Sequence, residues 1–525
     1  MRPSPQLVWQ RWSRFWMAIV AAVIAWLILA WFAFPESIRD GALILIALGL
    51  VVPAFVALRE GNVSKWIQPA TPEALGAIRI WIALILLASV IWEDLPSSAY
   101  LPRGMLDLNH SFLISILYSL PIGFDRMLAS PSALRVFEGA TTLALALAAI
   151  GLFTRWTVPI GAIAYMVFAA IFRSYSWTYH TGIIPLYALL LLSFTPCGDG
   201  LSLDRWRRMR RGETVPAARK AELVYGLGRY LIWMGVAIPY TLAGMSKLRN
   251  GGFLWWRGEH LKQMVLATIV EPMHFDFELS FRMIHLPTWM FDMLGLVALL
   301  TELTFVLVLV SRLARKVLPA VMASTHVGIL FMQNILFPDL IAIQAIFYDW
   351  SPLFRRIRVR TAEGVAFAAQ TARAVRVESV VARAFLVLAV FVWATRTEKY
   401  PLTAMQMFSR MQQIGPVVYV RPIVYYEDGT REPAKFERWI GAVADTRYRR
   451  LIREWERRPE RLPLLHEFLQ IAASRANATA PPGRRIDRFE LELRRWDFRR
   501  EPNDPDRGKL LNVVRHDVRA QQPGS

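Results

Sequence analysis

The sequence predicts an all-α polytopic membrane bundle of about eleven transmembrane helices, followed by a small α+β domain outside the cytoplasm. Three observations lead to this expectation. The chain of 525 residues is 55% hydrophobic and only 19% charged, and its apolar residues gather in runs of the length that crosses a bilayer. Lys and Arg concentrate in the short connections between these runs, as in cytoplasmic loops. From residue 398 onward the composition becomes polar and loses the long apolar runs.

The strongly basic balance is explained by membrane topology. A formal net charge of +20 would suggest nucleic acid as the partner of a soluble protein. Here the cations lie in loops between apolar runs, so we expect a lipid membrane as the partner and no nucleic acid. The single cysteine, Cys197, excludes an intramolecular disulfide and a cysteine-based metal site. No metal is predicted, because paired His-x-x-x-His spacing is also absent from the sequence.

Eleven apolar stretches are interpreted as membrane spans, and each is bounded by charged residues, Pro or Gly. Residues 1–68 hold two extra N-terminal helices, 69–397 the main transmembrane domain, and 398–525 the extracytoplasmic domain. A further apolar stretch at 112–120 is too short to cross and is expected at the interface. The expected spans are residues 15–34, 41–58, 78–92, 134–153, 157–172, 180–194, 223–245, 289–310, 318–337, 339–350 and 384–395.

The basic loops give the expected orientation. With a cytoplasmic N-terminus, the basic stretches at 204–220, 312–316 and 355–383 all fall on the cytoplasmic side. The first apolar run is too long for the core of a signal peptide, so it is expected to remain as a span. Residues after 398 then lie outside the cytoplasm. The short span at 339–350 is decisive, because a re-entrant segment there would reverse the side of the tail.

The tail carries the patterns of a small α+β domain. Residues 417–426 are rich in Val, Ile and Tyr and run into Glu427-Asp-Gly-Thr430, which predicts a strand entering a turn. Residues 446–458 are predicted to be helical, and 488–494 alternate as a half-buried strand does. A segment of about 120 residues is large enough to form its own core.

Ionisable residues beside or within the spans are the candidate functional residues, because such groups are usually paired, line a cavity or snorkel to the interface. Lys247, at the outer end of its span, is either a snorkelling side chain or a desolvated base. His180 begins a span and is either an interfacial histidine or an acid, base or hydrogen-bond donor. His326 lies near the middle of a span, and Gln333 is on the same helix face roughly 10 Å further along. Glu302 either pairs with a neighbour or supports the same site.

Four segments resemble the vitamin K-dependent γ-carboxylase-like family, also called the HTTM (horizontally transferred transmembrane) domain. The resemblance covers about residues 69–408. Its motifs are Ser176-Trp177-Thr-Tyr-His180 with Ser202-Leu-Asp204; Ala243-Gly-Met-Ser-Lys247-Leu with Trp256 and Gly258; His326 with Asn334, Leu336, Phe337 and Pro338; and Tyr400-Pro-Leu-Thr403 with Met407-Phe408. Ser246 stands where the carboxylase has the first lysine of a Lys-Lys pair, and the tail is much smaller than the carboxylase's lumenal region.

The resemblance implies a lyase or oxygenase that uses a reduced lipid quinone of the vitamin K or menaquinone type, together with oxygen and carbon dioxide. Lys247 would be the base toward the hydroquinone, and His180 and His326 would orient or stabilise the developing oxyanion. Glu302 would support them. The residues expected to contact the cofactor are Trp177, Trp256, Gln333 and Asn334.

Two other functions compete with this expectation. Some proteins with similar membrane bundles assist maturation or assembly, which predicts a non-catalytic factor whose outer domain binds an exported protein or peptide. A transporter is a weaker alternative, because we find no Gly- or Pro-broken helices in corresponding halves of the chain. The enzyme requires a proton-accepting Lys247, whereas the maturation factor requires only a folded bundle and its outer domain.

Overall fold

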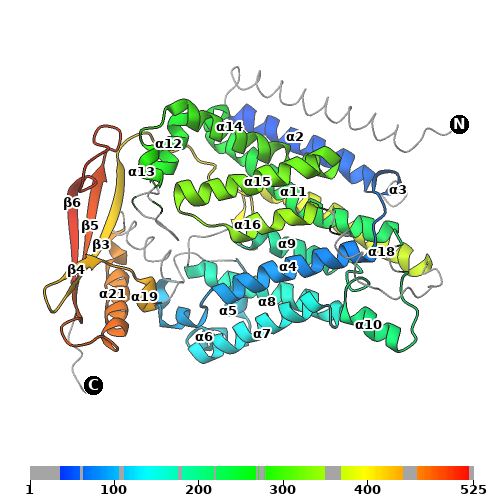
Figure 1. Ribbon diagram of the computed structural model, residues 1–525, viewed down its shortest axis with the longest axis horizontal. Helices are drawn as coiled ribbons and strands as arrows, with labels where there is room; N and C mark the ends of the chain where they lie inside the picture. The colour runs from blue at the N-terminus through cyan, green and yellow to red at the C-terminus, as the bar shows by residue number, and fades with distance from the viewer. Residues whose placement is uncertain are drawn as a thin grey trace.

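The computed structural model describes residues 36–58, 63–105, 112–175, 180–217, 220–267, 270, 277, 279–348, 350, 368–440 and 458–518. Long helices form a bundle along the long axis of the molecule, and a β-sheet with a covering helix closes one end of it (Figure 1). The expected first span at 15–34 lies outside the described residues, as does nearly all of the expected helix at 446–458.

Seven helices within the described part of the chain are long and apolar enough to cross a membrane. They overlap the spans expected at 41–58, 78–92, 134–153, 157–172, 223–245, 289–310 and 384–395. The expected count of about eleven is not confirmed. The seven are Asp40–Ala57, Pro72–Tyr100, Pro131–Ile150, Thr154–Ser174, Leu223–Gly251, Thr288–Leu309 and Ala372–Ala394.

Three further expected spans, among the described residues, are helical but differ from the sequence expectation in length or composition. The span expected at 180–194 is helix α9 (Ile183–Leu192), which is only ten residues long. The span expected at 318–337 is α15 (Arg312–Gln333), which begins with a basic turn and ends where Asn334 adopts a left-handed φ of 57°. The span expected at 339–350 is a short α-helix, α16 (Pro338–Ala342), continued by the 3₁₀ helix η5 (Ile343–Phe347).

The other helices have the following bounds. The bundle contains α2 (Glu36–Ala57), α3 (Val63–Trp66), α4 (Pro72–Trp92), η1 (Pro96–Tyr100), α5 (Phe112–Ser119), α6 (Phe124–Leu128), α7 (Pro131–Ile150), α8 (Thr154–Tyr175), α10 (Leu203–Arg210), α11 (Leu223–Gly251), η3 (Phe253–Trp256), α12 (Gly258–Ala267), α13 (Leu279–Met283), α14 (Thr288–Thr304), η4 (Phe305–Leu309) and α18 (Ala368–Ala394). Helices α19 (Glu437–Ile440), η7 (Pro459–Arg461) and α21 (Leu462–Asn477) belong to the tail.

Arg79, in α4, ties three segments together at the end of the bundle away from the sheet. Its side chain is fully buried. Nη1 donates to the carbonyl of Cys197 at 2.7 Å, and Nη2 donates to the carbonyls of Leu201 at 2.7 Å and Ala149 at 3.4 Å. A buried charge is costly unless it is hydrogen-bonded. Arg79 therefore satisfies carbonyls that the end of α7 and the loop after α9 would otherwise leave unpaired.

The Ser202-Leu-Asp204 motif has a structural role at the same end. Ser202 is the N-cap of α10, and its hydroxyl accepts from the backbone N–H of Arg205 at 2.9 Å. The Asp204 carboxylate accepts from the backbone N–H groups of Phe153 and Thr154, both at 2.7 Å. These donors are the orphaned amides at the start of α8. The motif thus joins α10 to the turn between α7 and α8.

The tail forms the expected α+β domain around one antiparallel sheet. The strand expected at 417–426 is β3 (Val417–Tyr426), and the strand expected at 488–494 is β5 (Ile486–Trp496). They pair in antiparallel register, with Ile423 opposite Glu490, and the strand order is β4-β3-β5-β6. The outer strands are β4 (Arg431–Pro433) and β6 (Lys509–Asp517), while β1 (Glu398–Lys399) and β2 (Leu402–Thr403) form a separate small hairpin.

Aromatic packing holds α21 on this sheet and the sheet on the bundle. Phe468 of α21 and Phe489 of β5 both pack against Phe436, with ring centroids 5.2 and 5.6 Å away. A second apolar cluster joins Leu266 and Ile284 of the bundle to Val417, Tyr419, Trp496 and Phe498 of the tail. The tail is therefore packed directly on the bundle end, and α10 lies at the opposite end (Figure 1).

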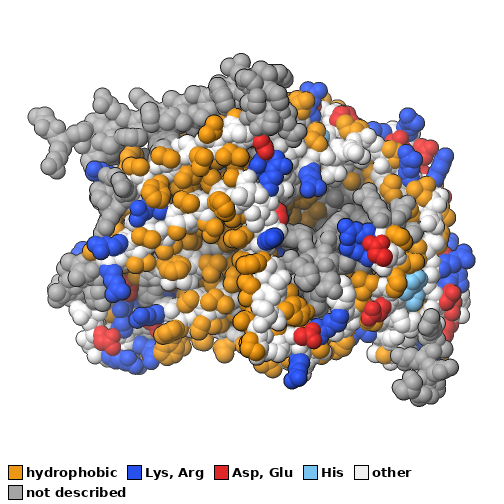
Figure 2. All heavy atoms as spheres, turned by 180° about the vertical axis from the view of Figure 1, so that it is seen from behind, with side chains coloured by type: hydrophobic (Ala, Val, Ile, Leu, Met, Phe, Trp, Pro, Cys, Tyr) orange, Lys and Arg blue, Asp and Glu red, His pale blue; other side chains and the backbone are white. Residues whose placement is uncertain are grey.

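The types of exposed side chain change along the long axis of the bundle. Hydrophobic side chains cover the middle of the helical face in Figure 2, whereas Lys and Arg gather toward the two ends. The most exposed large apolar residues include Trp92, Val136 and Trp156, which are 73%, 73% and 65% exposed. A wide exposed apolar surface on a folded protein indicates contact with lipid or another apolar partner. The arrangement is compatible with a lipid membrane around the bundle.

Replacing Arg79 should strongly destabilise the fold. Arg79→Met removes two short charged hydrogen bonds, each contributing roughly 1.5–3 kcal/mol, so we expect a loss of about 3–6 kcal/mol. Thermal unfolding in detergent would measure it. Arg135→Met, at an exposed site on α7, is the control and should change stability by less than about 0.5 kcal/mol. Equal stability of the two variants would show that Arg79 is not a structural clamp.

The two ends of the bundle should label from opposite sides of the membrane. Arg210→Cys in α10 and Glu427→Cys in the turn after β3 place exposed thiols at these ends. In sealed, right-side-out vesicles, a membrane-impermeant maleimide should react with the second and not the first. Unsubstituted protein should stay unlabelled, because Cys197 is buried. Labelling of both thiols from one side would mean that the chain crosses the membrane one time fewer than expected. The short segment 339–350 would then be the first candidate for a segment that does not cross.

Candidate functional site

A buried ion pair lies at the centre of the candidate site. Lys247 lies inside α11 rather than beyond its end, and its side chain is only 5% exposed. Its Nζ donates to Glu302 Oε1 of α14 at 2.9 Å and lies 2.7 Å from Oε2. The Lys247 ammonium also lies 5.3 Å from the ring centroid of Trp255. The side chain is thus enclosed and paired, which is not the geometry of a snorkelling lysine.

The segment 398–409, which follows α18, closes over this pair. The carbonyl of Met407 accepts from Lys247 Nζ at 3.2 Å, and that of Ala404 accepts from Ser246 Oγ at 2.8 Å. Ser246 Oγ in turn accepts from Trp393 Nε1 at 3.0 Å. Ser246, which replaces a lysine of the family motif, therefore joins α11 to both α18 and the 398–409 segment. The pair gains additional acceptors, which a buried ammonium requires.

His180 reaches the same segment from the other side. Thr403 Oγ1 donates to Glu398 Oε2 at 2.7 Å and accepts the backbone N–H of Met405 at 3.0 Å. Its single proton is therefore used, so His180 Nε2, 3.2 Å away, must be the donor in their contact. Nδ1 of His180 is left as a proton acceptor. It makes no hydrogen bond within the described part of the chain.

The charge state of His180 follows from its surroundings. Burial, together with the positive charges of Arg173 and Lys247, holds the pKa of His180 well below its ordinary range. The imidazole is therefore neutral at pH 7. A neutral ring with a protonated Nε2 can accept a proton only at Nδ1, which is the function expected of a base or a hydrogen-bond acceptor.

His326 is also held as a neutral ring with one open nitrogen. It is 5% exposed in α15, and Nδ1 donates to the carbonyl of Met322, one turn earlier, at 2.8 Å. The rings of Tyr240 and Phe337 pack on it edge-on, at 5.9 and 6.0 Å between centroids. Since a carbonyl only accepts, Nε2 carries the lone pair. Nε2 has no hydrogen-bond partner among the residues that the structure describes.

The three predicted catalytic residues, His180, Lys247 and His326, lie in one region of the structure. Lys247 is near enough to exert a Coulombic effect on both His180 and His326. The three come from the helix-preceding turn of α9, from α11 and from α15, so separate motifs of the sequence converge in space. His180 and Lys247 both contact the 398–409 segment, and His326 packs on Tyr240, about two turns before Lys247 in α11.

The residues expected to contact a cofactor have unused polar atoms. Trp256 Nε1, Gln333 Oε1 and Asn334 Nδ2 are buried and make no hydrogen bond to the described part of the protein. Asn334 Oδ1 accepts from the backbone N–H of Phe277 at 3.1 Å, so only its amide nitrogen is open. Trp177 lies outside the described residues. Unsatisfied buried polar groups in a folded protein need an explanation, and an absent ligand or water is one.

Several buried ionisable residues were missed by the sequence reasoning. Asp339 is 3% exposed and accepts the backbone N–H of Gly182 at 2.6 Å, two residues from His180. Glu378, in α18, is fully buried and neither carboxylate oxygen has a hydrogen-bond partner among the described residues. Trp255, rather than Trp256, stacks with Lys247 and donates to the carbonyl of Phe408 at 2.8 Å. Little in the sequence indicated Glu378, because it lies in the basic stretch 355–383 and outside every expected span.

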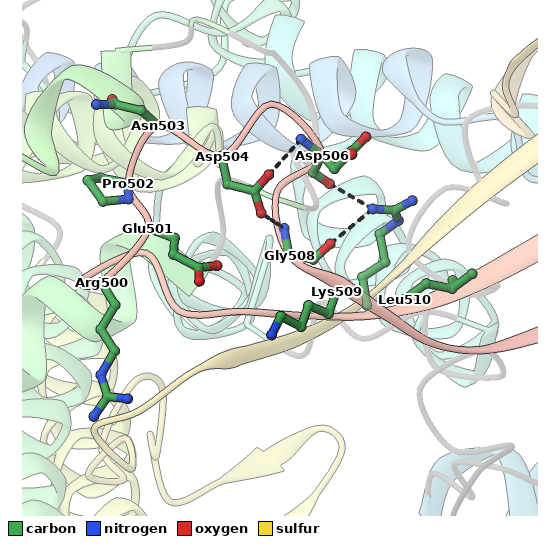
Figure 3. A pocket seen from close by; sticks show the side chains of 10 residues that line it. Arg500, Glu501, Pro502, Asn503, Asp504, Asp506, Gly508, Lys509 and Leu510 are labelled. Carbon is green, nitrogen blue, oxygen red and sulfur yellow. Dashed lines mark hydrogen bonds between the residues drawn. The ribbon is translucent and has the colours of Figure 1, made fainter.

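A cavity of about 790 Å³ on the tail domain is less suited to a ligand (Figure 3). Asp504 accepts from the backbone N–H of Asp506 at 3.0 Å and of Gly508 at 2.7 Å. Arg494 Nη1 donates to the carbonyls of the same two residues, at 2.9 and 3.1 Å. These polar groups serve the conformation of the loop between β5 and β6, so the described contacts assign it a structural role.

Comparison of the chain with family models, with curated proteins and with solved structures found no match.

The buried pair makes a specific stability prediction. Lys247→Met leaves Glu302 as an uncompensated buried carboxylate, which should cost about 3–5 kcal/mol. Lys247→Met combined with Glu302→Met removes both charges and keeps similar volume, so most of that loss should be recovered. Unfolding temperatures in one detergent would compare the variants.

The control for this prediction is Lys399→Met, at an exposed site in β1, which should behave as the unsubstituted protein. If Lys247→Met also matched the unsubstituted protein, the ion pair would contribute nothing to the fold. If the double variant were less stable than the single one, Glu302 would not depend on Lys247.

Proposed function

We propose that this chain is a membrane enzyme of the vitamin K-dependent γ-carboxylase-like (HTTM) group, which binds a reduced lipid quinone at the sheet end of its bundle and removes a proton from it. The observation that carries the proposal is the buried Lys247–Glu302 pair together with His180 and His326, which each keep one ring nitrogen without a partner among the described residues. Buried ionisable groups clustered in this way are typical of proton-transfer sites.

The residues present fit such a cofactor by their unused hydrogen-bonding atoms. Two donors, Trp256 Nε1 and Asn334 Nδ2, and one acceptor, Gln333 Oε1, are buried without protein partners. A quinol ring offers hydroxyl groups that both donate and accept, and its tail is apolar. Apolar sites with a few placed polar groups are the usual form of small-molecule pockets. A reduced quinone would supply an acidic hydroxyl and two reducing electrons.

The roles of the chain's own groups follow from their contacts. Lys247 must be neutral to act as a base, and Glu302, 2.7 Å away, is the group that can hold its proton. Lys247 Nζ then accepts the cofactor's proton. His180 and His326 are neutral acceptors, so they orient a hydroxyl group of the cofactor. This role differs from the stabilisation of an oxyanion that was expected from the sequence.

The proposed orientation places this site on the outer side of the membrane. The site and the tail domain lie at the same end of the bundle, and the basic α10 lies at the other (Figure 1). The positive-inside rule favours the cytoplasm for the α10 end. The N-terminus is then cytoplasmic, and the region of His180, Lys247 and His326 lies on the outer side.

A maturation factor for an exported protein or peptide is the second candidate, and one observation favours it. Strand β6 pairs only with β5 among the described strands, so its outer edge is open. Leu510 and Leu511 on that strand are 50% and 51% exposed. An open strand edge can accept a strand of a partner protein. This function would need the tail domain but not the proton-accepting groups.

Lipid analysis distinguishes the two functions. The full chain is purified in mild detergent, and its bound lipids are extracted and identified by mass spectrometry. We expect a quinone-class lipid with the unsubstituted protein and at least about tenfold less with His326→Ala, since one lost ligand hydrogen bond contributes on the order of 1.4 kcal/mol. Gln333→Leu should also lose the lipid, because its open Oε1 has no role in the protein's own hydrogen bonding.

The matched control is His285→Ala, at an exposed histidine, which should retain the lipid. Gln333→Leu distinguishes loss of lipid binding from misfolding. Gln333 Oε1 has no hydrogen-bond partner among the described residues, so this variant should fold as the unsubstituted protein does. Bulk phospholipid alone in every sample would overturn the quinone proposal and leave the maturation factor as the better interpretation.

A further inference from the structure

A basic cavity of about 350 Å³ lies at the end of the bundle that carries α3, away from the sheet (Figure 1). Five helices contribute to it: the end of α3, the start of α11, the end of η4, the start of α15 and the end of η5. Its charged lining residues are Arg229 of α11 and Arg312, Arg315 and Lys316 of α15. No described Asp or Glu is among its lining residues.

The cations of this cavity lie close to one another. The Arg229 and Arg315 guanidinium groups lie 4.7 and 5.0 Å from the ring centroid of Trp233. Arg229 and Arg312 both repel Arg315 electrostatically. Within the described residues, Arg312, Arg315 and Lys316 form no ion pair with a carboxylate. Like charges held this close destabilise each other, and a bound anion would remove that repulsion.

Helix α15 adds a further contribution at the same place. Ser311 caps it by accepting the backbone N–H of Ala314 at 3.2 Å, and the helix continues for 22 residues. The N-terminal end of a helix carries partial positive charge and binds phosphate groups readily. The cationic side chains and the helix end therefore act on the same volume.

A neighbouring cavity shows that this is not a general property of the basic end. That cavity, of about 520 Å³, also contains several arginines. There, however, Arg208 pairs with Asp199 at 2.8 Å, and Arg211 lies 3.8 Å from Glu213. Two of its arginines are thus paired with carboxylates, whereas the α15 cations have no carboxylate partner among the described residues.

The surroundings of the basic cavity indicate a ligand that belongs to the membrane. Its lining includes Trp66, Tyr230 and Tyr348, residue types that concentrate at the headgroup level of bilayers. On α15 itself, Leu313 and Val317 are 71% and 47% exposed beside the cations. Exposed apolar side chains next to a cationic cavity can contact an acyl chain while the cavity holds the headgroup.

We propose that this cavity binds the phosphate headgroup of an anionic membrane lipid, with Arg312, Arg315 and Lys316 as its principal contacts. The site is separate from the Lys247 region and requires no property of the proposed quinone site. The ligand class is a phosphodiester that carries a net negative charge and acyl chains. Inorganic phosphate shares the headgroup chemistry but lacks the chains.

Thermal unfolding of the full chain in detergent tests the proposal. Separate samples receive dioctanoyl phosphatidylglycerol, dioctanoyl phosphatidylcholine or sodium phosphate. Phosphatidylglycerol should raise the unfolding temperature in a saturable way, because it binds only the folded protein. In the triple variant Arg312→Gln, Arg315→Gln, Lys316→Gln, the apparent affinity should fall roughly a hundredfold, since each cation contributes about fivefold.

The matched control removes the same charge elsewhere, with Arg207→Gln, Arg210→Gln and Arg211→Gln in and beside α10. It should bind phosphatidylglycerol as the unsubstituted protein does. If the first triple variant fails to fold, the single variants Arg312→Gln and Lys316→Gln, both at exposed side chains, should each lower the affinity about fivefold.

Three results would overturn the proposal. Equal stabilisation by phosphatidylcholine would show that headgroup charge is irrelevant. Equal stabilisation by sodium phosphate at matched concentration would assign the site to a free anion rather than a lipid. An equal loss of affinity in the α10 control would mean that net charge, and not this cavity, attracts the lipid.

Discussion

The burial of the Lys247–Glu302 pair is the constraint on which the sheet end of the bundle depends. Two charges taken out of water are stable only when each is paired and its remaining hydrogen-bonding capacity is met. Helices α11 and α14 supply the pair, and the carbonyl of Met407 in the 398–409 segment is a further acceptor for the ammonium. The path of the chain after α18 is therefore coupled to a charge buried inside the bundle.

The two ends of the bundle treat polar groups differently. At the α10 end, Arg79 and Asp204 form hydrogen bonds with backbone groups at helix ends, and these bonds make a rigid junction. At the sheet end, His180 and His326 each keep one ring nitrogen uncommitted among the described residues, and Gln333 and Asn334 keep open atoms. Rigid junctions support a fold, whereas open buried atoms are retained where a ligand or a proton must be accommodated.

The motifs that carry the family resemblance divide along the same line. Ser202 and Asp204 are explained fully by helix capping and by the turn that they stabilise. Ser246 is explained by its contacts with Trp393 and the carbonyl of Ala404. Packing alone does not explain a lysine at position 247, because two apolar residues of similar volume would avoid the desolvation cost of the pair. Ser202, Asp204 and Ser246 therefore have roles in the fold, whereas Lys247 is a cost to stability that the fold does not require.

The sequence alone indicated the helical class, the seven longest apolar helices and the two central strands of the tail, because apolar periodicity and run length are local properties. It also singled out His180, Lys247, His326 and Glu302, since charge within an apolar run is visible without a structure. It missed the ends of α9 and α15, where Gly182 and Asn334 adopt left-handed conformations that tertiary contacts stabilise.

The pairings were decided only by the tertiary structure. Lys247 and Glu302 are 55 residues apart, and His180 meets Thr403 across 223 residues, so nothing local specifies either contact. The same holds for the cations of α11 and α15 around Trp233. Each helix must bury its own apolar face to be stable in the bundle, and the packing that satisfies all of these faces at once determines which polar residues become neighbours.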